Sequence, residues 1–251
     1  MKGFALLGHI GNSVVPAECV DGCCSPSASL SRIQKLIGAR MSQSKRTKPC
    51  FYIETKADLT ELMGLRPSLR KALGVKVTTN AFYIRVLALA AVEYPLMMGV
   101  LEGSIRKGCV RIPDSVNIGF AVNAPHGLVV PVIKQAQRRS LAEIARMEQE
   151  LTDRARDNQL KLDELEGETI ALSNLGAYGI DSFIGIVPPP TSSILSVGNV
   201  IRAVVPGDCV PEGRKMVSLT VAADHRIING VYAARFLSFI RERLENPQQL
   251  V

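Results

Sequence analysis

The chain has 251 residues, enough for one large domain or two small ones with a substantial buried core. With 47% hydrophobic residues, 21% charged residues and few aromatics, its composition is that of a soluble globular protein. No apolar run is long enough to span a bilayer, and the net charge of +7 comes from scattered cations without a recognisable nucleic-acid module. These features argue against a membrane protein and against nucleic-acid binding. The positive charge suits a phosphate-bearing ligand and is equally compatible with plain solubility.

Residues 1–29 are expected to form a flexible N-terminal tail. Three of the six cysteines fall in its Gly/Ser/Pro-rich stretch ECVDGCCSPSAS, residues 18–29. No second Cys/His pair follows at zinc-site spacing, so we expect no metal site. The dispersed remaining cysteines suit reduced thiols inside a cell. The N-terminus is a poor match to a secretory signal or to an arginine-rich presequence; we expect a cytoplasmic protein, with the mitochondrial matrix as the alternative.

The first predicted elements are a helix, a strand and a second helix. Ser29 or Ser31 can cap a helix that runs to about Ser44. Pro49 ends this helix, and residues 50–55 have the composition of a strand. Asp58 is placed to cap the next helix, whose apolar stripe consists of Leu59, Leu62, Met63 and Leu65.

A buried helix and a hairpin are predicted in the middle of the chain. Residues 81–93 are apolar nearly all round, which indicates a central helix that begins at Thr78-Thr79-Asn80. Short strands follow, in which residues 119–122 and 128–133 flank a turn at 125–127.

Residues 140–155 form the clearest amphipathic helix. Ser140 and Glu143 have the spacing of a capping box. We expect Leu141, Ile144, Ala145, Met147 and Leu151 to face inward, and Glu143, Arg146, Glu148 and Glu150 to face water.

Three further strands, at 169–172, 193–197 and 216–221, precede a closing helix at 231–244. Mixed strands with helices on one face predict an α/β two-layer sandwich, formed as a single domain by residues 30–251. No glycine-rich phosphate loop of a nucleotide-binding type is present.

The block VAADHRIINGVYAARFL, residues 221–237, carries the strongest functional signal. A buried strand ends at Asp224-His225-Arg226, and Asn229-Gly230 begins a helix. A histidine at such a junction is held rigidly and can still reach a cleft, where a neutral imidazole can take a proton from a thiol or hydroxyl. The alternative is that His225 is an ordinary loop histidine.

This block resembles the His-x-x-x-Asp-Gly signature of the dihydrolipoamide acyltransferases, the core subunits of 2-oxoacid dehydrogenase complexes. Residues 31–62, 116–133 and 168–198 are similar to other segments of that family in the expected order, so the resemblance runs from about Leu30 to Val251. It implies a sandwich of the chloramphenicol acetyltransferase type and acyl transfer between dihydrolipoyl and coenzyme A thiols.

The resemblance also implies roles for single residues. His225 matches the general base, and Ser173 of ALSNLG matches the hydroxyl that stabilises the oxyanion. The alternative for Ser173 is a serine that caps the turn at residues 174–176. Asn229 stands where we expect the family's acidic residue, whose arginine partner matches Arg66; Asp224 and Gly230 are expected to support the site.

The change to Asn229 predicts either reduced activity or a non-catalytic structural core subunit. Asn229→Asp should then raise the rate by forming an ion pair with Arg66. Two other differences from the family are Cys50, which suits the start of a strand, and Met97-Met98, which either reshape the acyl pocket or pack in the core.

The resemblance implies a homotrimer whose active sites lie between subunits, and a larger cubic or dodecahedral core of about 24 or about 60 subunits. Coenzyme A would be a substrate, and another domain or chain would supply the lipoyl group, because no lipoyl-lysine segment is visible. We therefore expect a catalytic core alone. A free-standing O-acetyltransferase of the chloramphenicol type is the remaining alternative.

Overall fold

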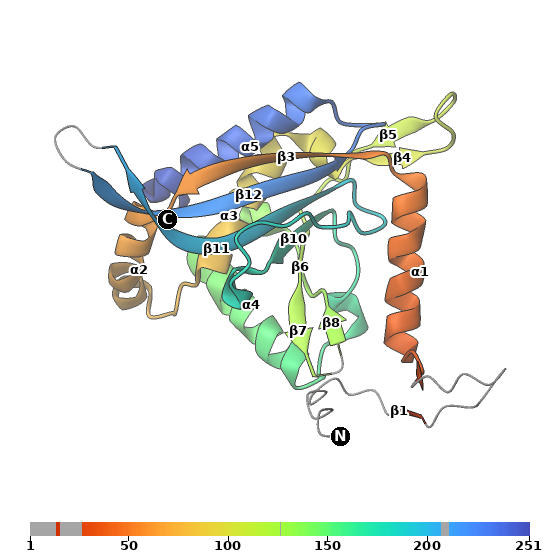
Figure 1. Cartoon of the computed structure of the whole chain (residues 1–251), viewed down its shortest axis with the longest axis horizontal. Coiled ribbons are helices and arrows are strands. Elements are labelled where there is room, and N and C mark those ends of the chain that lie inside the picture. Colours follow the sequence, from red (N-terminus) through yellow and green to blue (C-terminus); the bar gives the residue numbers. More distant parts are fainter. Residues whose placement is uncertain (1–13, 16–26, 126, 207–210) are drawn as a thin grey trace, which may run out of the picture.

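The computed structural model describes residues 14–15, 27–125, 127–206 and 211–251 (Figure 1). In the N-terminal region it places two short antiparallel strands, β1 (Val14–Val15) and β2 (Ser27–Ala28). The rest of the predicted flexible tail lies outside the described residues, apart from Ser29. The boundary between tail and domain stays a prediction.

A six-stranded mixed sheet forms one layer of the domain, in the order β3-β12-β11-β10-β6-β9. β10 runs parallel to β11 and β6, and the other neighbouring pairs are antiparallel. The strands are β3 (Cys50–Asp58), β6 (Ile118–Phe120), β9 (Val132–Ile133), β10 (Ile170–Asn174), β11 (Ser193–Val205) and β12 (Glu212–Asp224). Two small hairpins, β4 (Val100–Glu102) with β5 (Cys109–Arg111) and β7 (Val122–Ala124) with β8 (Gly127–Val129), lie beside it.

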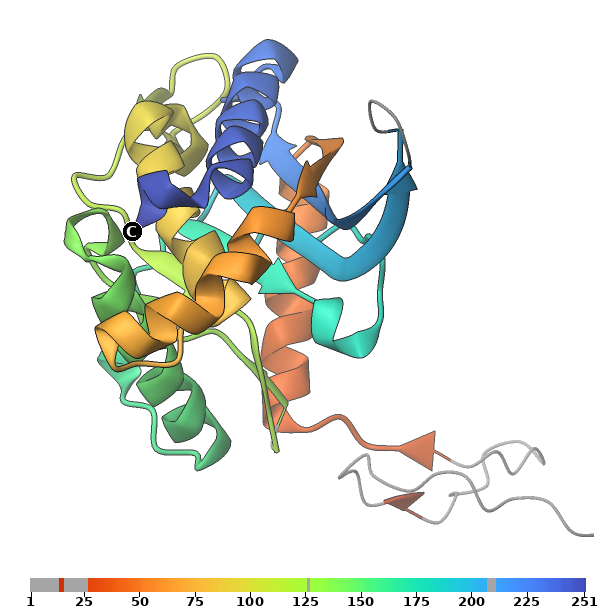
Figure 2. The same cartoon turned by 90° about the vertical axis from the view of Figure 1, so that its left-hand side faces the viewer.

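Four helices form the second layer, together on one side of the sheet (Figure 2). They are α2 (Thr60–Leu73), α3 (Thr79–Glu93), α4 (Leu141–Arg156) and α5 (Gly230–Glu245). Short 3-10 turns, among them η1 (Pro95–Met98), η4 (Gly176–Tyr178) and η5 (Pro247–Leu250), connect or end these elements. The predicted two-layer α/β sandwich is therefore confirmed.

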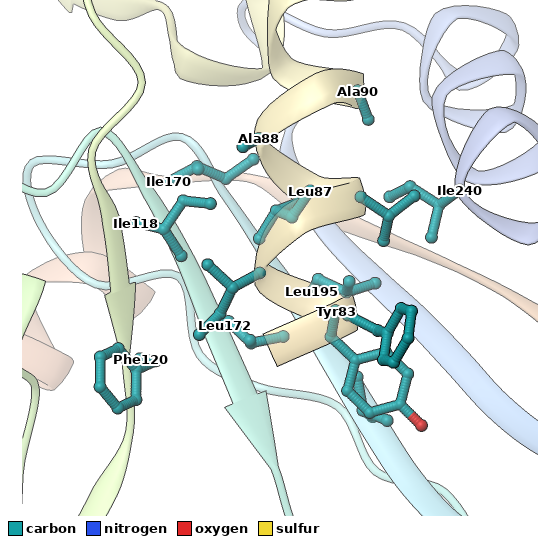
Figure 3. Close-up of a cluster of buried hydrophobic side chains, with 14 of the residues drawn as sticks. Tyr83, Leu87, Ala88, Ala90, Ile118, Phe120, Ile170, Leu172, Leu195 and Ile240 are labelled. Carbon is teal, nitrogen blue, oxygen red and sulfur yellow. The ribbon is translucent and has the colours of Figure 1, made fainter. Parts of the chain in front are cut away.

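The core is built around α3, which the sequence predicts as a buried helix. Nine of its side chains are buried. Figure 3 shows Leu87 and Ala88 of α3 toward side chains of β6 and β10, and Ile240 of α5 on the other side of α3. A helix enclosed in this way holds the sheet and α5 in a fixed relation, which in turn fixes the loop between β12 and α5.

The helix α1 (Arg32–Thr47) stands apart from the other helices (Figure 1). Its C-terminal half is tied to the irregular segment 177–191. The Ser44 hydroxyl donates to the carbonyl of Val187 at 2.5 Å, and Arg40 donates to the carbonyl of Pro189 at 2.6 Å. Arg40 also pairs with Glu168 at 3.3 Å, just before β10.

Several local predictions are confirmed by their hydrogen bonds. Ser31, one of the two predicted candidates, is the N-cap of α1, where it forms a capping box with Gln34. Ser140 and Glu143 form the predicted capping box at α4. Asp58 accepts hydrogen bonds from the backbone and the hydroxyl of Thr60, but the N-cap of α2 is Leu59, so the predicted cap is one residue away from the observed one. None of the described helices is long and apolar enough to cross a membrane.

Two predictions are wrong. The strands β11 and β12 are longer than the predicted strands 193–197 and 216–221. The outer half of their hairpin consists of half-buried and exposed residues, so it does not show the apolar composition on which the prediction depended. Glu148 faces inward with only 8% of its surface exposed. It lies four residues after Ile144 and seven after Leu141, so helical periodicity places it on the apolar face of α4.

Candidate active site

His225 lies directly after the end of β12, in the loop that leads into α5. Its backbone N–H donates to the carbonyl of Pro49 at 3.0 Å, and its ring lies 4.7 Å from the ring of Phe51, at an angle of 53°. The side chain is exposed. The imidazole is therefore supported on one side by an aromatic ring and remains open to an incoming group.

A buried ion pair shapes the turn that carries His225. Asp224 is 1% exposed, and its carboxylate accepts hydrogen bonds from the Nε and Nη2 atoms of Arg226, at 2.9 and 2.6 Å. It also accepts from the Arg226 backbone N–H at 3.1 Å. Because each carboxylate oxygen has a donor, burial of this charge is compensated. Asp224 thus holds the turn that precedes α5, and its role in the site stays a prediction.

Lys48 and Cys50 lie on the other side of Asp224. Lys48 Nζ donates to the carbonyls of Pro188 and Thr191, and burial lowers the pKa of this lysine. Burial, followed by the charge of Asp224, raises the pKa of the Cys50 thiol. The thiol therefore stays protonated near neutral pH and does not compete as a nucleophile.

Ser173 is the penultimate residue of β10, opposite Ser196 in β11. The turn after it is capped by Asn174, whose Oδ1 accepts from the Gly176 backbone N–H at 2.9 Å. Gly176 is required there, since a Cβ atom would lie 2.6 Å from the carbonyl oxygen of Gly198. The turn-capping role thus belongs to Asn174, which leaves the Ser173 hydroxyl available for a ligand.

Ser173 lines a cavity of about 670 Å³, a size typical of small-molecule sites. The walls come from β6, the β7–β8 hairpin, one face of α4, and the residues that follow Ser173. Its polar side chains include Asn80, Asn123, Glu148, Thr152, Arg156 and Asn174. The serine therefore faces a space that can hold part of a substrate.

Ser173 and His225 do not meet within the chain. In the register of the sheet, Ser173 is opposite Ser196 of β11, and Ser196 is opposite Thr220 of β12. Thr220 lies five residues before His225. Two strand spacings of about 4.8 Å and five residues of about 3.3 Å place the two Cα atoms roughly 19 Å apart. A hydroxyl and an imidazole at this distance cannot act on the same carbonyl group.

Asn229 and Arg66 do not pair within the chain, so this prediction is wrong. Asn229 is the N-cap of α5, and its Oδ1 accepts from the Tyr232 backbone N–H at 2.9 Å. Arg66 in α2 donates from Nε to the carbonyl of Val77 at 3.0 Å. The two residues follow opposite ends of the antiparallel strands β3 and β12, and the two ends of the nine-residue strand β3 are themselves roughly 26 Å apart (Figure 1).

The structure also places Gly230, Met97, Met98 and Cys50. Gly230 is the first residue of α5, where an added Cβ would meet no described atom within 4 Å, so packing does not require glycine there. Met97 and Met98 are buried in the core and do not line the Ser173 cavity. Cys50 begins β3, as expected. Among the described residues, no group of three or more His, Cys, Asp or Glu side chains could hold a metal.

Two supporting side chains were not predicted. Phe51 packs on the imidazole. This contact follows from the pairing of β3 with β12, which the sequence alone does not reveal. Glu148 lines the Ser173 cavity, and its helical spacing from Leu141 and Ile144 indicates the inward face of α4.

The capping role of Asn229 has a testable consequence for stability. Asn229→Ala should lower the free energy of unfolding by about 1 kcal/mol, because the Tyr232 N–H loses its acceptor. Asn229→Asp should be at least as stable as the wild type, since a carboxylate caps equally well and its charge is favourable at a helix N-terminus. Chemical denaturation at one fixed protein concentration measures both. An aspartate variant less stable than the alanine variant would contradict the capping role.

Comparison with known proteins gives a consistent result. Residues 25–251 match the model of the 2-oxoacid dehydrogenases acyltransferase catalytic domain. The chain is 32% identical over 88% of its length to the mitochondrial dihydrolipoyllysine-residue acetyltransferase component of the Schizosaccharomyces pombe pyruvate dehydrogenase complex, of which it covers 46%. The chain thus spans about half the length of this curated relative.

Two solved structures extend the comparison. The cubic core of a pyruvate dehydrogenase complex is 29% identical, with a TM-score of 0.85 over 94% of this chain and 99% of that one. The Azotobacter vinelandii dihydrolipoamide acetyltransferase is 28% identical, with the same TM-score and coverage.

The Azotobacter vinelandii enzyme was studied for the role of a serine, a histidine and an asparagine in its catalytic mechanism. Its histidine follows the serine by 52 residues, and its asparagine follows the histidine by four. The same spacings separate Ser173, His225 and Asn229. The expectation that asparagine departs from the family at this position is therefore wrong for this relative. On its fold and its match to the family over residues 25–251, the chain belongs to the 2-oxoacid dehydrogenase acyltransferases, as a catalytic domain of that family.

Proposed function

We propose that the chain transfers an acetyl group between dihydrolipoyl and coenzyme A thiols, at a site shared by two subunits. The observation that carries this proposal is the arrangement of Ser173, His225 and Asn229. Their spacing equals that of the three residues studied in the Azotobacter vinelandii acetyltransferase, on a fold that matches it closely. The acetyl group is chosen because the curated relative is an acetyltransferase component.

The chemistry assigns one step to each side chain. The His225 imidazole takes the proton from the coenzyme A thiol, and the thiolate attacks the thioester carbonyl of the acetyl-lipoyl group. The Ser173 hydroxyl donates a hydrogen bond to the oxyanion of the tetrahedral intermediate. When the intermediate collapses, the dihydrolipoyl sulfur leaves and recovers the proton from the imidazolium. Asn229 is a positioning residue, because it caps the helix that follows the His225 loop.

Assembly of several copies would bring the two halves of the site together. The roughly 19 Å between Ser173 and His225 within one subunit requires a neighbour to complete the site. The segment 177–191 also leaves large apolar side chains exposed, namely Tyr178, Ile180, Ile184 and Ile186, as expected where a second copy docks. The described residues thus favour a cyclic oligomer, for which we propose a trimer within a cubic or dodecahedral core.

The natural acyl donor would be a lipoyl group on another domain or polypeptide, and coenzyme A would be the second substrate. The location of the protein would be that of the complex, cytoplasmic or in the mitochondrial matrix. The structural-subunit alternative loses its main argument, since an asparagine at this spacing belongs to a relative with a studied catalytic mechanism.

The first test is the transfer of acetyl groups from acetyl-coenzyme A to free dihydrolipoamide by the purified protein. Measurable, saturable turnover is expected. Inactivity with all acyl-coenzyme A substrates would favour the structural subunit. Acetylation of chloramphenicol-like hydroxyl compounds, with dihydrolipoamide ignored, would favour the O-acetyltransferase alternative.

The second test asks whether one site uses two subunits. His225→Ala and Ser173→Ala homo-oligomers should each be nearly inactive. After the two variants are co-assembled in equal amounts, about a quarter of the sites should contain both native side chains, if subunits mix at random in a cyclic oligomer. Activity should therefore recover to about a quarter of the wild-type value. No recovery in verified hetero-oligomers would contradict a shared site.

A further inference from the structure

The cavity lined by Ser173 contains a buried carboxylate for which the proposed reaction has no use. Glu148 is 8% exposed and lines this cavity from α4. Thr152 and Arg156 follow it at intervals of four residues and line the same cavity. One face of α4 therefore forms a polar wall of the space into which the Ser173 hydroxyl opens.

Two donors hold the Glu148 carboxylate in place. The Thr78 hydroxyl donates to Oε2 at 2.9 Å, and Asn80 Nδ2 donates to Oε1 at 3.4 Å. Burial raises the pKa of Glu148, whereas these two hydrogen bonds and the charges of Lys76 and Arg156 oppose that rise. The two hydrogen bonds therefore fix the acidic group of Glu148 on the wall of the cavity.

Two cations, Lys76 and Arg156, lie near Glu148, and Arg156 lines the same cavity. Arg156 lies two helical turns away, and its side chain is exposed, as is that of Lys76. Water and salt screen these exposed cations, whereas a carboxylate that is nine-tenths buried is screened much less. A ligand group that lies next to Glu148 therefore meets mainly this acidic side chain, while Arg156 lies further along the same wall.

We propose that Glu148 is a specificity-determining residue, which excludes acyl groups that end in a carboxylate from the Ser173 cavity. The inference rests on the proposed acyl transfer. An acyl group whose carbonyl oxygen is bound by Ser173 places the rest of its chain in this cavity. A neutral chain meets no charge penalty there, but a terminal carboxylate faces a like charge in a partly desolvated space.

The test compares two acyl groups of equal chain length. Butyryl and succinyl groups both have four carbons, and they end in a methyl group and a carboxylate respectively. In the wild type, kcat/KM for transfer from succinyl-coenzyme A to dihydrolipoamide should be at least about tenfold below that for butyryl-coenzyme A. In Glu148→Gln, the succinyl-to-butyryl ratio should rise by about tenfold, since the like charge is gone.

Glutamine should fit the site without loss of hydrogen bonds. Among the described residues, Asn80 Oδ1 is a buried oxygen without a hydrogen-bond partner. Rotation of the Asn80 amide would let this oxygen accept from the new amide of Glu148→Gln. The Thr78 hydroxyl can still donate to the remaining carbonyl oxygen. The substitution thus removes the charge and keeps the shape.

Glu150→Gln is the matched control, because Glu150 lies on the same helix with a side chain that is 68% exposed, outside the residues that line the cavity. The succinyl-to-butyryl ratio of kcat/KM in Glu150→Gln should equal that of the wild type. An unchanged ratio in Glu148→Gln, or equal use of both substrates by the wild type, would overturn the inference. Wild-type inactivity with acetyl-coenzyme A would instead refute the proposed function.

Discussion

Replacing His225 with alanine should lower kcat for acetyl transfer by about 10²–10⁴-fold, the range expected when a general base is lost. Without the imidazole, the coenzyme A thiol keeps its proton and is a poor nucleophile. The His225 side chain is exposed, so the variant should fold and assemble normally. Steady-state transfer to dihydrolipoamide measures the rate, and thermal unfolding with size determination checks the fold.

Free imidazole provides an independent check on the role of His225. The alanine variant leaves a space beside the Phe51 ring, which lies 4.7 Å from the native imidazole ring. Imidazole added to the assay should recover part of the lost activity, because the free molecule can occupy this space and act as the base in place of the missing side chain. An alanine variant that retains most of the wild-type activity would show that His225 is not the base.

The parts of the fold that depend on neighbours in sequence could be predicted. The capping boxes at Ser31 and Ser140 involve residues three positions apart, so the sequence alone contains both partners. The buried helix α3 was predictable for the same reason, since its apolar composition continues around all faces. The strand, turn and helix around His225 also follow from a local pattern.

Contacts between distant residues could not be predicted in the same way. The expected pair of Arg66 and Asn229 required the two loops to lie at one end of the sheet. The antiparallel register of β3 and β12 places them at opposite ends, and this register depends on long-range packing rather than on local sequence. Likewise, only the strand order and register reveal that Ser173 and His225 are far apart in one subunit.

The misplacement of Glu148 has a different cause. Its charge suggested a water-facing position, while its spacing from Leu141 and Ile144 indicated the buried face of α4. Burial is possible because Thr78 and Asn80, at the start of α3, provide donors that the sequence alone does not bring near. A buried charge that conflicts with residue-type preference is often associated with function.

Replacing Ser173 with alanine should lower kcat by about 10²–10³-fold, as expected when one donor to an oxyanion is removed. The effect should fall on kcat more than on KM, because the hydrogen bond forms with the oxyanion rather than with the bound thioester. The turn should remain intact, since Asn174 makes its capping hydrogen bond to Gly176. Initial rates over a range of both thiol substrates separate kcat from KM.

Ser173→Thr is the matched variant, because it keeps a hydroxyl at the same carbon and adds one methyl group. The cavity of about 670 Å³ leaves room for this methyl, so Ser173→Thr should retain more activity than Ser173→Ala. Asn174→Ala should instead act through the turn: it removes the acceptor for the Gly176 N–H and should lower stability by about 1 kcal/mol. If Ser173→Ala raised KM alone and left kcat unchanged, Ser173 would be a binding residue, and the oxyanion would require another donor.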